Sequence, residues 1–173
     1  MRHRLTFALA ALISAVAPTG PAMAEIELVR AGIVCPDGRN GPLRDAPDTV
    51  LGGVREIADL AVDVETRDVP LIPGLGLGIE TRWQGDGPHF VRMLTLHPPM
   101  GSTGTTRQSY GKTLIPGDVS VRAYTFEFAY ELVPGVWSLQ VTDETGLLLS
   151  VDFTVSDAPN AAVTEGCGLS LNS

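Results

Sequence analysis

Apolar and polar side chains alternate most regularly between residues 121 and 132. Alternation with a period of two predicts a β-strand whose successive side chains point to opposite faces of a sheet. One face is aromatic and the other is mostly small or charged: Arg122, Tyr124, Phe126, Phe128, Tyr130 and Leu132 against Val121, Ala123, Thr125, Glu127, Ala129 and Glu131. Pro134-Gly135 predicts a turn, and the alternation resumes over 137–142 and 147–155. We therefore expect a three-stranded meander in the second half of the chain.

The first half contains further strand-like segments separated by turn residues. They cover residues 26–34, 54–69, 75–83 and 90–96, and Gln84-Gly-Asp-Gly-Pro88 between the last two is typical of a hairpin loop. Seven strands and no convincing amphipathic helix indicate an all-β fold. A domain with this pattern is expected to be an antiparallel immunoglobulin-like β-sandwich of about seven strands, spanning residues 25–158.

The segment from Pro98 to Asp118 differs in composition, because Gly, Ser, Thr and Pro dominate it. We interpret it as a long loop, and long loops in small domains are often functional. A binding surface is expected here, with Arg107, Gln108, Tyr110 and Lys112 as contact residues, since Tyr and Arg are common interface anchors. The alternative is that the segment is merely a mobile loop.

The N-terminal 24 residues have the three parts of a secretory signal peptide. A basic start is followed by an uncharged run from Leu5 to Ala17 and by Ala22-Met-Ala24, which predicts cleavage between Ala24 and Glu25. The apolar run is too short for a membrane span, which needs about 20 apolar residues. Its removal from the 173 residues leaves 149, with no other candidate span. We expect the mature chain to be periplasmic or secreted.

Net charge excludes some partners. The chain carries 20 acidic and 12 basic residues, a formal charge of −8, which becomes −10 when Arg2 and Arg4 leave with the signal peptide. Nucleic acids and anionic membranes are bound by clustered Lys and Arg. Neither is expected as a partner. Another envelope protein is the partner that an exported binding domain would meet.

Cys35 and Cys167 are the chain's two cysteines. In an oxidising compartment, an even number of cysteines predicts a disulfide bond. Neither cysteine has a His or a second Cys nearby, as a metal site would need, or the basic surroundings of a reactive thiol. The predicted bond would tether the C-terminal tail, residues 159–173, to the end of the first strand.

One stretch resembles a known family. It runs from Tyr124 through Glu131-Leu-Val-Pro-Gly-Val-Trp137 and ends with Phe153-Thr-Val155. It is similar to a family of small secreted bacterial immunoglobulin-like domains classified as a domain of unknown function; Ile72–Gly78 and Leu96–Met100 are similar to further parts of that pattern. The likeness covers about residues 62–155. It implies the sandwich fold and no particular chemistry.

His89, Met93, His97 and Met100 form the candidate metal site. Exported copper proteins use His and Met ligands, and these four lie within twelve residues. The alternatives are that Met93 fills the core and that His97 ends a strand before Pro98-Pro99. A small metal or ligand carrier is therefore the second functional hypothesis, and a protease-inhibitor-like module is a third.

Catalysis is not expected. The sequence has no Gly-x-Ser-x-Gly motif, and only two histidines remain after signal removal. Gly111-Lys-Thr113 lacks the spacing of a phosphate-binding loop. We expect no cofactor, and interpret Trp83 and Trp137 as core residues. The leading hypothesis is a non-enzymatic binding or accessory domain of the cell envelope.

Overall fold

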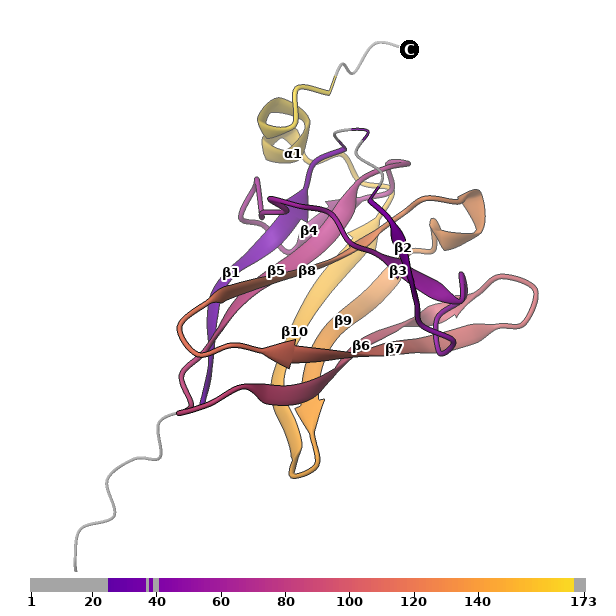
Figure 1. Cartoon of the computed structure of the whole chain (residues 1–173). Helices are drawn as coiled ribbons and strands as arrows, with labels where there is room; N and C mark the ends of the chain where they lie inside the picture. The colour runs from indigo at the N-terminus through magenta and orange to yellow at the C-terminus, as the bar shows by residue number, and fades with distance from the viewer. Residues whose placement is uncertain (1–24, 37, 39–40, 170–173) are drawn as a thin grey trace, which may run out of the picture.

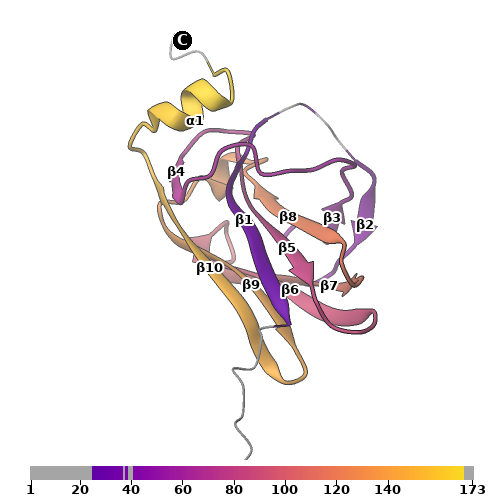
Figure 2. The same cartoon turned by 90° about the vertical axis from the view of Figure 1, so that its left-hand side faces the viewer.

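The computed structural model describes residues 25–36, 38 and 41–169 (Figures 1 and 2). The predicted signal peptide, Ala24 at its cleavage site and residues 170–173 lie outside this range. The described chain forms ten strands, one short 3-10 helix and one α-helix. The strands are β1 Ile26–Val34, β2 Leu43–Asp45, β3 Gly53–Arg55, β4 Asp68–Pro70, β5 Gly76–Trp83, β6 His89–Met100, β7 Thr105–Leu114, β8 Val119–Thr125, β9 Gly135–Asp143 and β10 Gly146–Ser156; the helices are η1 Ala129–Glu131 and α1 Ala161–Gly166.

Two sheets make up the body of the fold. One has the strand order β1-β5-β8 and the other has the order β4-β10-β9-β6-β7, while β2 and β3 form a separate hairpin. All pairs are antiparallel except β4 with β10. The predicted all-β sandwich is therefore confirmed. Within the predicted strand at 54–69 only the short strands β3 and β4 form, and β2, β7 and α1 were not expected.

The core lies between the two sheets and is largely aliphatic and aromatic. Its largest fully buried side chains include Trp137, Phe126 and Phe153. Trp83 and Trp137 are 5% and 0% exposed, which confirms the prediction that both belong to the core. The indole nitrogen of Trp137 donates to the carbonyl of Val133 at 3.0 Å, so its one polar atom is satisfied.

One lateral edge of the sandwich, which we call the sealed edge, is closed where β1 meets β4 and β10. The chain after Val62 first lies along β1, where the amide of Ile33 donates to the carbonyl of Val64 at 2.8 Å, and then pairs with β10 as β4. Val69 and Val155 are each 1% exposed. A single segment thus joins the edges of both sheets and covers them with apolar side chains.

A disulfide bond strengthens the sealed edge. Cys35 and Cys167 are bonded, as predicted, with Cα atoms 5.3 Å apart and a separation of 132 positions in sequence. Cys167 follows α1, whose N-cap Asn160 accepts from the amides of Ala162 and Val163. Val163 is fully buried. Figure 2 shows α1 above β4 and β10, on the side of the sandwich away from β2 and β3.

The prediction of a long loop at 98–118 is wrong, because most of this segment is β-strand. Residues 98–100 belong to β6, and 105–114 form β7, which pairs with β6 from Leu114 to Thr105. Only a tight turn separates the strands, with Gly101 and Gly104 at φ of +66° and +62°. The Ser- and Thr-rich composition reflects an edge strand with few apolar residues, and Pro98-Pro99 lies at the register shift where β6 pairing is interrupted.

The predicted strand at 121–132 ends early. β8 stops at Thr125, and residues 129–131 form η1. The alternation of burial therefore fails after Phe126: Phe128 is 42% exposed, whereas Glu131 on the supposed outer face is 3% exposed. A buried carboxylate that accepts hydrogen bonds from its own turn favours the 3-10 conformation over an extended one.

The segment of residues 42–60, which includes the β2–β3 hairpin, crosses the opposite lateral edge, and we call it the roof. It is fastened to β7, because the amide of Ser109 donates to the carbonyl of Asp48 at 3.0 Å and the amide of Val50 donates to the side chain of Gln108 at 2.8 Å. Arg55 and Glu127 form an ion pair at 3.0 Å. Figure 2 places β2 and β3 beside β8, far from β4 and β10.

No helix within the described part of the chain has the length and apolar character needed to cross a membrane.

Candidate functional site

The candidate site is a cleft of about 820 Å³ at the lateral edge opposite the sealed edge. We call this the open edge. Its walls are β7 and β8, the edge strands of the two sheets, and the roof extends over it. β7 and β8 are not hydrogen-bonded as neighbours in either sheet. The cleft therefore occupies the gap that the two sheets leave between them on this side.

Residues of both strands line the cleft. On β7 they include Gln108, Tyr110 and Lys112, and on β8 every residue from Val119 to Thr125 contributes, among them Ser120, Arg122 and Tyr124. The amide of Gln108 donates to the hydroxyl of Tyr124 at 3.3 Å, and the guanidinium of Arg122 lies 5.6 Å from the ring centre of Tyr110. Many of the side chains that line the cleft are therefore polar or charged, unlike those of the core.

A hydrogen-bonded network forms one end of the cleft. The side-chain oxygen of Gln108 accepts from the roof, so its amide nitrogen is the atom that donates to Tyr124 and to His97 Nε2 at 3.3 Å. His97 Nδ1 lies 2.8 Å from the carbonyl of Pro98, which can only accept. The ring is therefore neutral, with its proton on Nδ1. Tyr124 in turn donates to Glu131 at 2.8 Å.

Burial shifts the pKa values of this network toward neutral forms. It lowers the pKa of His97 below 6.5, and the hydrogen bond to Pro98 opposes the shift only in part. It raises the pKa of Glu131 above 4.5, against the hydrogen bonds from Phe128 and Tyr124. It also raises the pKa of Tyr124 far above 10.0. These groups stabilise this end of the cleft through their mutual hydrogen bonds.

The other end of the cleft is cationic. Arg122 is 3% exposed and donates to the carbonyl of Gln140 at 2.9 Å and to the hydroxyl of Thr95 at 2.6 Å, both on the opposite sheet. Lys112 donates to the carbonyl of Val121 at 3.4 Å. Burial lowers the pKa of each cation, and the positive charge of Arg44 lowers that of Lys112 further.

Three of the four residues predicted to form a binding surface line this cleft. Gln108, Tyr110 and Lys112 do so, whereas Arg107, which precedes them on β7, is exposed and does not line the cleft. The prediction placed them on a loop, but they belong to a strand. Sequence reasoning missed Arg122 as a candidate. The available signal was a single cation within an otherwise aromatic face.

The four candidate metal ligands are not brought together. His89 and His97 lie eight residues apart on β6, a separation of about 25 Å along an extended strand, so they cannot share one ion. Met93 is buried in the core, and Met100 contacts Tyr124. Among the residues that the structure describes, no group of three or more His, Cys, Asp or Glu side chains could hold a metal ion.

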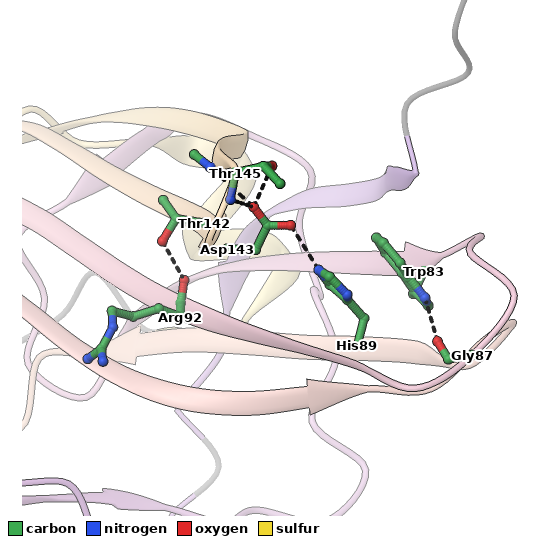
Figure 3. Close-up of polar contacts among 8 residues, drawn as sticks. Trp83, Gly87, His89, Arg92, Thr142, Asp143 and Thr145 are labelled. Carbon is green, nitrogen blue, oxygen red and sulfur yellow. Dashed lines mark hydrogen bonds and ion pairs between the residues drawn. The ribbon is translucent and has the colours of Figure 1, made fainter.

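Figure 3 shows what His89 contacts instead. Its Nε2 lies 2.9 Å from Asp143, and its ring stacks on Trp83 with centroids 4.3 Å apart. Asp143 also accepts from the side chain and amide of Thr145, and these hydrogen bonds together lower its pKa to about 2. This cluster therefore fastens the β9–β10 turn to the start of β6.

Comparisons with known proteins add little to the fold. No family model matches the chain, and no curated protein matches it, so membership of the family named above stays a prediction. An immunoglobulin-like protein from Pseudomonas aeruginosa is 23% identical with a TM-score of 0.48, and the match covers 78% of this chain and 99% of that one. A TM-score this low carries no argument. The strand pairing itself establishes the sandwich.

Two glycoside hydrolases are also similar in part. The β-D-glucoside glucohydrolase of Trichoderma reesei has a TM-score of 0.34 and 13% identity, over 79% of this chain and 19% of that one. The β-glucosidase of Kluyveromyces marxianus has a TM-score of 0.27 and 16% identity, over 47% of this chain and 12% of that one. This chain thus corresponds to less than a fifth of either enzyme's length.

Proposed function

We propose that this protein is an exported binding domain without catalytic activity, and that its ligand occupies the open-edge cleft. The observation that carries this proposal is the cleft itself. Its volume of about 820 Å³ is within the range of about 300–1,000 Å³ typical of ligand sites. Polar side chains from two sheets converge in it, as they do where a scaffold orients a bound molecule.

Export is supported by the disulfide between Cys35 and Cys167, because such bonds persist in oxidising compartments. The N-terminal sequence agrees with this, and we propose a periplasmic or secreted location. The absence of catalysis is supported by the chemistry of the cleft. Tyr124 and Glu131, its most enclosed acidic groups, are hydrogen-bonded to each other rather than aligned with a nucleophile.

The geometry favours a small ligand over another envelope protein docked on β7. Gln108, Tyr110 and Lys112 point into the cleft, where a flat protein surface would not reach them. The amide of Ser109 is already occupied by the roof carbonyl of Asp48, so a partner strand cannot add to β7 at this position. A ligand small enough to enter between β7 and the roof meets neither obstacle.

A fragment screen by nuclear magnetic resonance tests the proposal. The mature protein, labelled with ¹⁵N, is titrated with neutral, anionic and cationic fragments. Amide shifts are expected to change in β7, β8 and the roof, and Tyr110→Leu is expected to weaken the best fragment. Phe90→Leu is the matched control, because Phe90 is a 64% exposed aromatic residue on β6 that does not line the cleft.

Two outcomes would contradict the proposal. One is that no fragment changes any shift at millimolar concentration. The other is that the changes cluster elsewhere, for example around Phe90, and that Tyr110→Leu binds as the wild type does.

A further inference from the structure

The cationic end of the cleft has a charge that the fold does not balance. Arg122 is almost completely buried, and its two hydrogen-bond acceptors, the carbonyl of Gln140 and the hydroxyl of Thr95, are both neutral. A guanidinium group keeps its charge in proteins and has five N–H groups. Burying a charge is costly unless an opposite charge accompanies it. Arg122 therefore has donors and a charge available to a further partner.

Two more cations lie nearby. The guanidinium groups of Arg122 and Arg44 are 5.6 Å and 6.0 Å from the ring centre of Tyr110, on which both converge. Burial lowers the pKa of Lys112 most, and the charges of Arg44 and Arg122 lower it further, while the charge of Glu56 acts against them. Like charges are therefore gathered at one place in a chain whose net charge is −8. Such a cluster is unfavourable in the empty cleft and favourable around an anion.

The carboxylates of the cleft are engaged with other groups. Glu56 pairs with Arg44 at 2.9 Å, and Glu127 pairs with Arg55 at 3.0 Å. Glu131 accepts from Tyr124. Within the described residues, no carboxylate lies within 4.0 Å of the side-chain nitrogens of Arg122 or Lys112. The missing counter-charge is therefore expected from a ligand.

A second observation points to the same place. The hydroxyl oxygen of Ser120 is buried and has no hydrogen-bond partner, the one such side-chain atom among the residues described. Ser120 lines the cleft on β8, two residues before Arg122 and on the same face. A buried hydroxyl without a hydrogen-bond partner destabilises the folded state. An oxygen atom of a bound anion would accept its proton.

Apolar side chains also line the cleft. Leu51, Val54 and Ile57 of the roof line it, together with Val121 of β8. A ligand that fills the volume therefore needs an apolar body beside its charged group. We propose that the open-edge cleft binds a small molecule with a carboxylate or phosphate group on an apolar body, and that Arg122, Lys112 and Ser120 contact the anionic group. This inference rests on the proposed function, because it names the ligand class of the same site.

The test uses four probes with the same six-carbon chain, hexanoate, hexyl phosphate, hexanamide and hexylamine, titrated into the mature protein. At least one anion is expected to bind about 10-fold or more tighter than hexanamide, and the better anion identifies the group as carboxylate or phosphate. If hexanamide or hexylamine binds as tightly as both anions, the cleft does not select an anionic group and the inference is overturned. The proposal that the cleft binds a ligand would still hold. If no probe binds at millimolar concentration, both proposals fail.

Variants separate charge recognition from a structural effect. Lys112→Gln and Arg122→Met are each expected to weaken the better anion about 10-fold or more, whereas Arg107→Gln, on the outer face of the same strand, leaves it unchanged. Glu56→Gln removes a negative charge that acts on Lys112 and is expected to tighten binding. Unfolding curves check that each variant folds. Wild-type affinity in Lys112→Gln together with no gain in Glu56→Gln would overturn the inference, whatever the fate of Arg122→Met.

Discussion

The two lateral edges of the sandwich are closed in different ways. At the sealed edge, residues 62–70 join β1 to β10, apolar side chains such as Val69 and Val155 fill the gap, and a disulfide fastens the end of the chain. At the open edge, β7 and β8 do not pair, the roof is held by a few hydrogen bonds and an ion pair, and the interior is polar and charged.

The difference separates stability from function. Burial of apolar surface stabilises a fold by about 25 cal/mol per Å² without regard to direction, which suits the sealed edge. A buried cation such as Arg122 gives no such gain and needs specific partners. A sandwich that can close one edge with valines has no structural need for a charged cleft at the other. We therefore assign stability to the sealed edge and propose that the open edge serves binding.

The largest expected effect is the loss of the disulfide. The double variant Cys35→Ser, Cys167→Ser removes a link between residues 132 positions apart, and we expect the free energy of unfolding to fall by about 4–5 kcal/mol in the chain-entropy relation. Denaturant unfolding measures it, with the fully oxidised wild type as reference. A fall below about 1 kcal/mol would show that residues 62–70 and α1 close the edge without the bond. Probe binding at the open edge should survive.

A smaller effect is expected from Gly32→Ala on β1. A Cβ atom there would lie 2.0 Å from the carbonyl oxygen of Val64, so the contact between β1 and residues 62–64 must open. Overpacking of this kind costs about 1–3 kcal/mol of unfolding free energy. Gly87→Ala is the matched control, because a Cβ at Gly87 meets nothing within 4 Å. Equal unfolding midpoints for the two variants would mean that β1 and residues 62–64 accommodate the added methyl group with little loss of stability.

The smallest effect concerns pH at the open edge. Burial lowers the pKa of His97 below 6.5, so the unfolded chain binds more protons than the folded one as the pH falls through this value. Its contribution to stability is therefore present above pH 6.5 and is lost as the pH falls toward the folded-state pKa. In His97→Gln, which cannot titrate, unfolding free energy should change less between about pH 7.5 and 5.5.

Glu131 belongs to the same network and acts in the opposite direction. Its pKa is raised above 4.5 in the folded state, so its contribution is present below pH 4.5 and is lost as the pH rises. The comparison of His97→Gln with the wild type at each pH removes this common contribution to first order. Parallel stability curves for the two proteins would show that His97 titrates in the folded state as it does in the unfolded one.

The sequence alone determined the fold class and the covalent tether. The strand-like segments 26–34, 75–83 and 137–155 were identified from local properties, namely β-branched content, flanking turn residues and, from 137 on, alternation of successive side chains, and each of them contains a strand. The pairing of Cys35 with Cys167 followed because no other cysteine was available. The strands could be predicted because they depend on residues close in sequence, and the disulfide could be predicted because the chain has two cysteines.

Only the tertiary structure decided where the binding residues lie. Composition indicated a loop at 98–118, but an edge strand on a polar cleft has the same Ser, Thr and Gly content, and the hydrogen bonds to β6 that make it a strand are non-local. Arg122 looked like one polar residue in an aromatic strand. Its role follows from what the opposite sheet and β7 place around it: neutral acceptors, further cations and no carboxylate within ion-pair distance among the described residues. Charge balance in a cleft depends on several distant segments, so no local pattern encodes it.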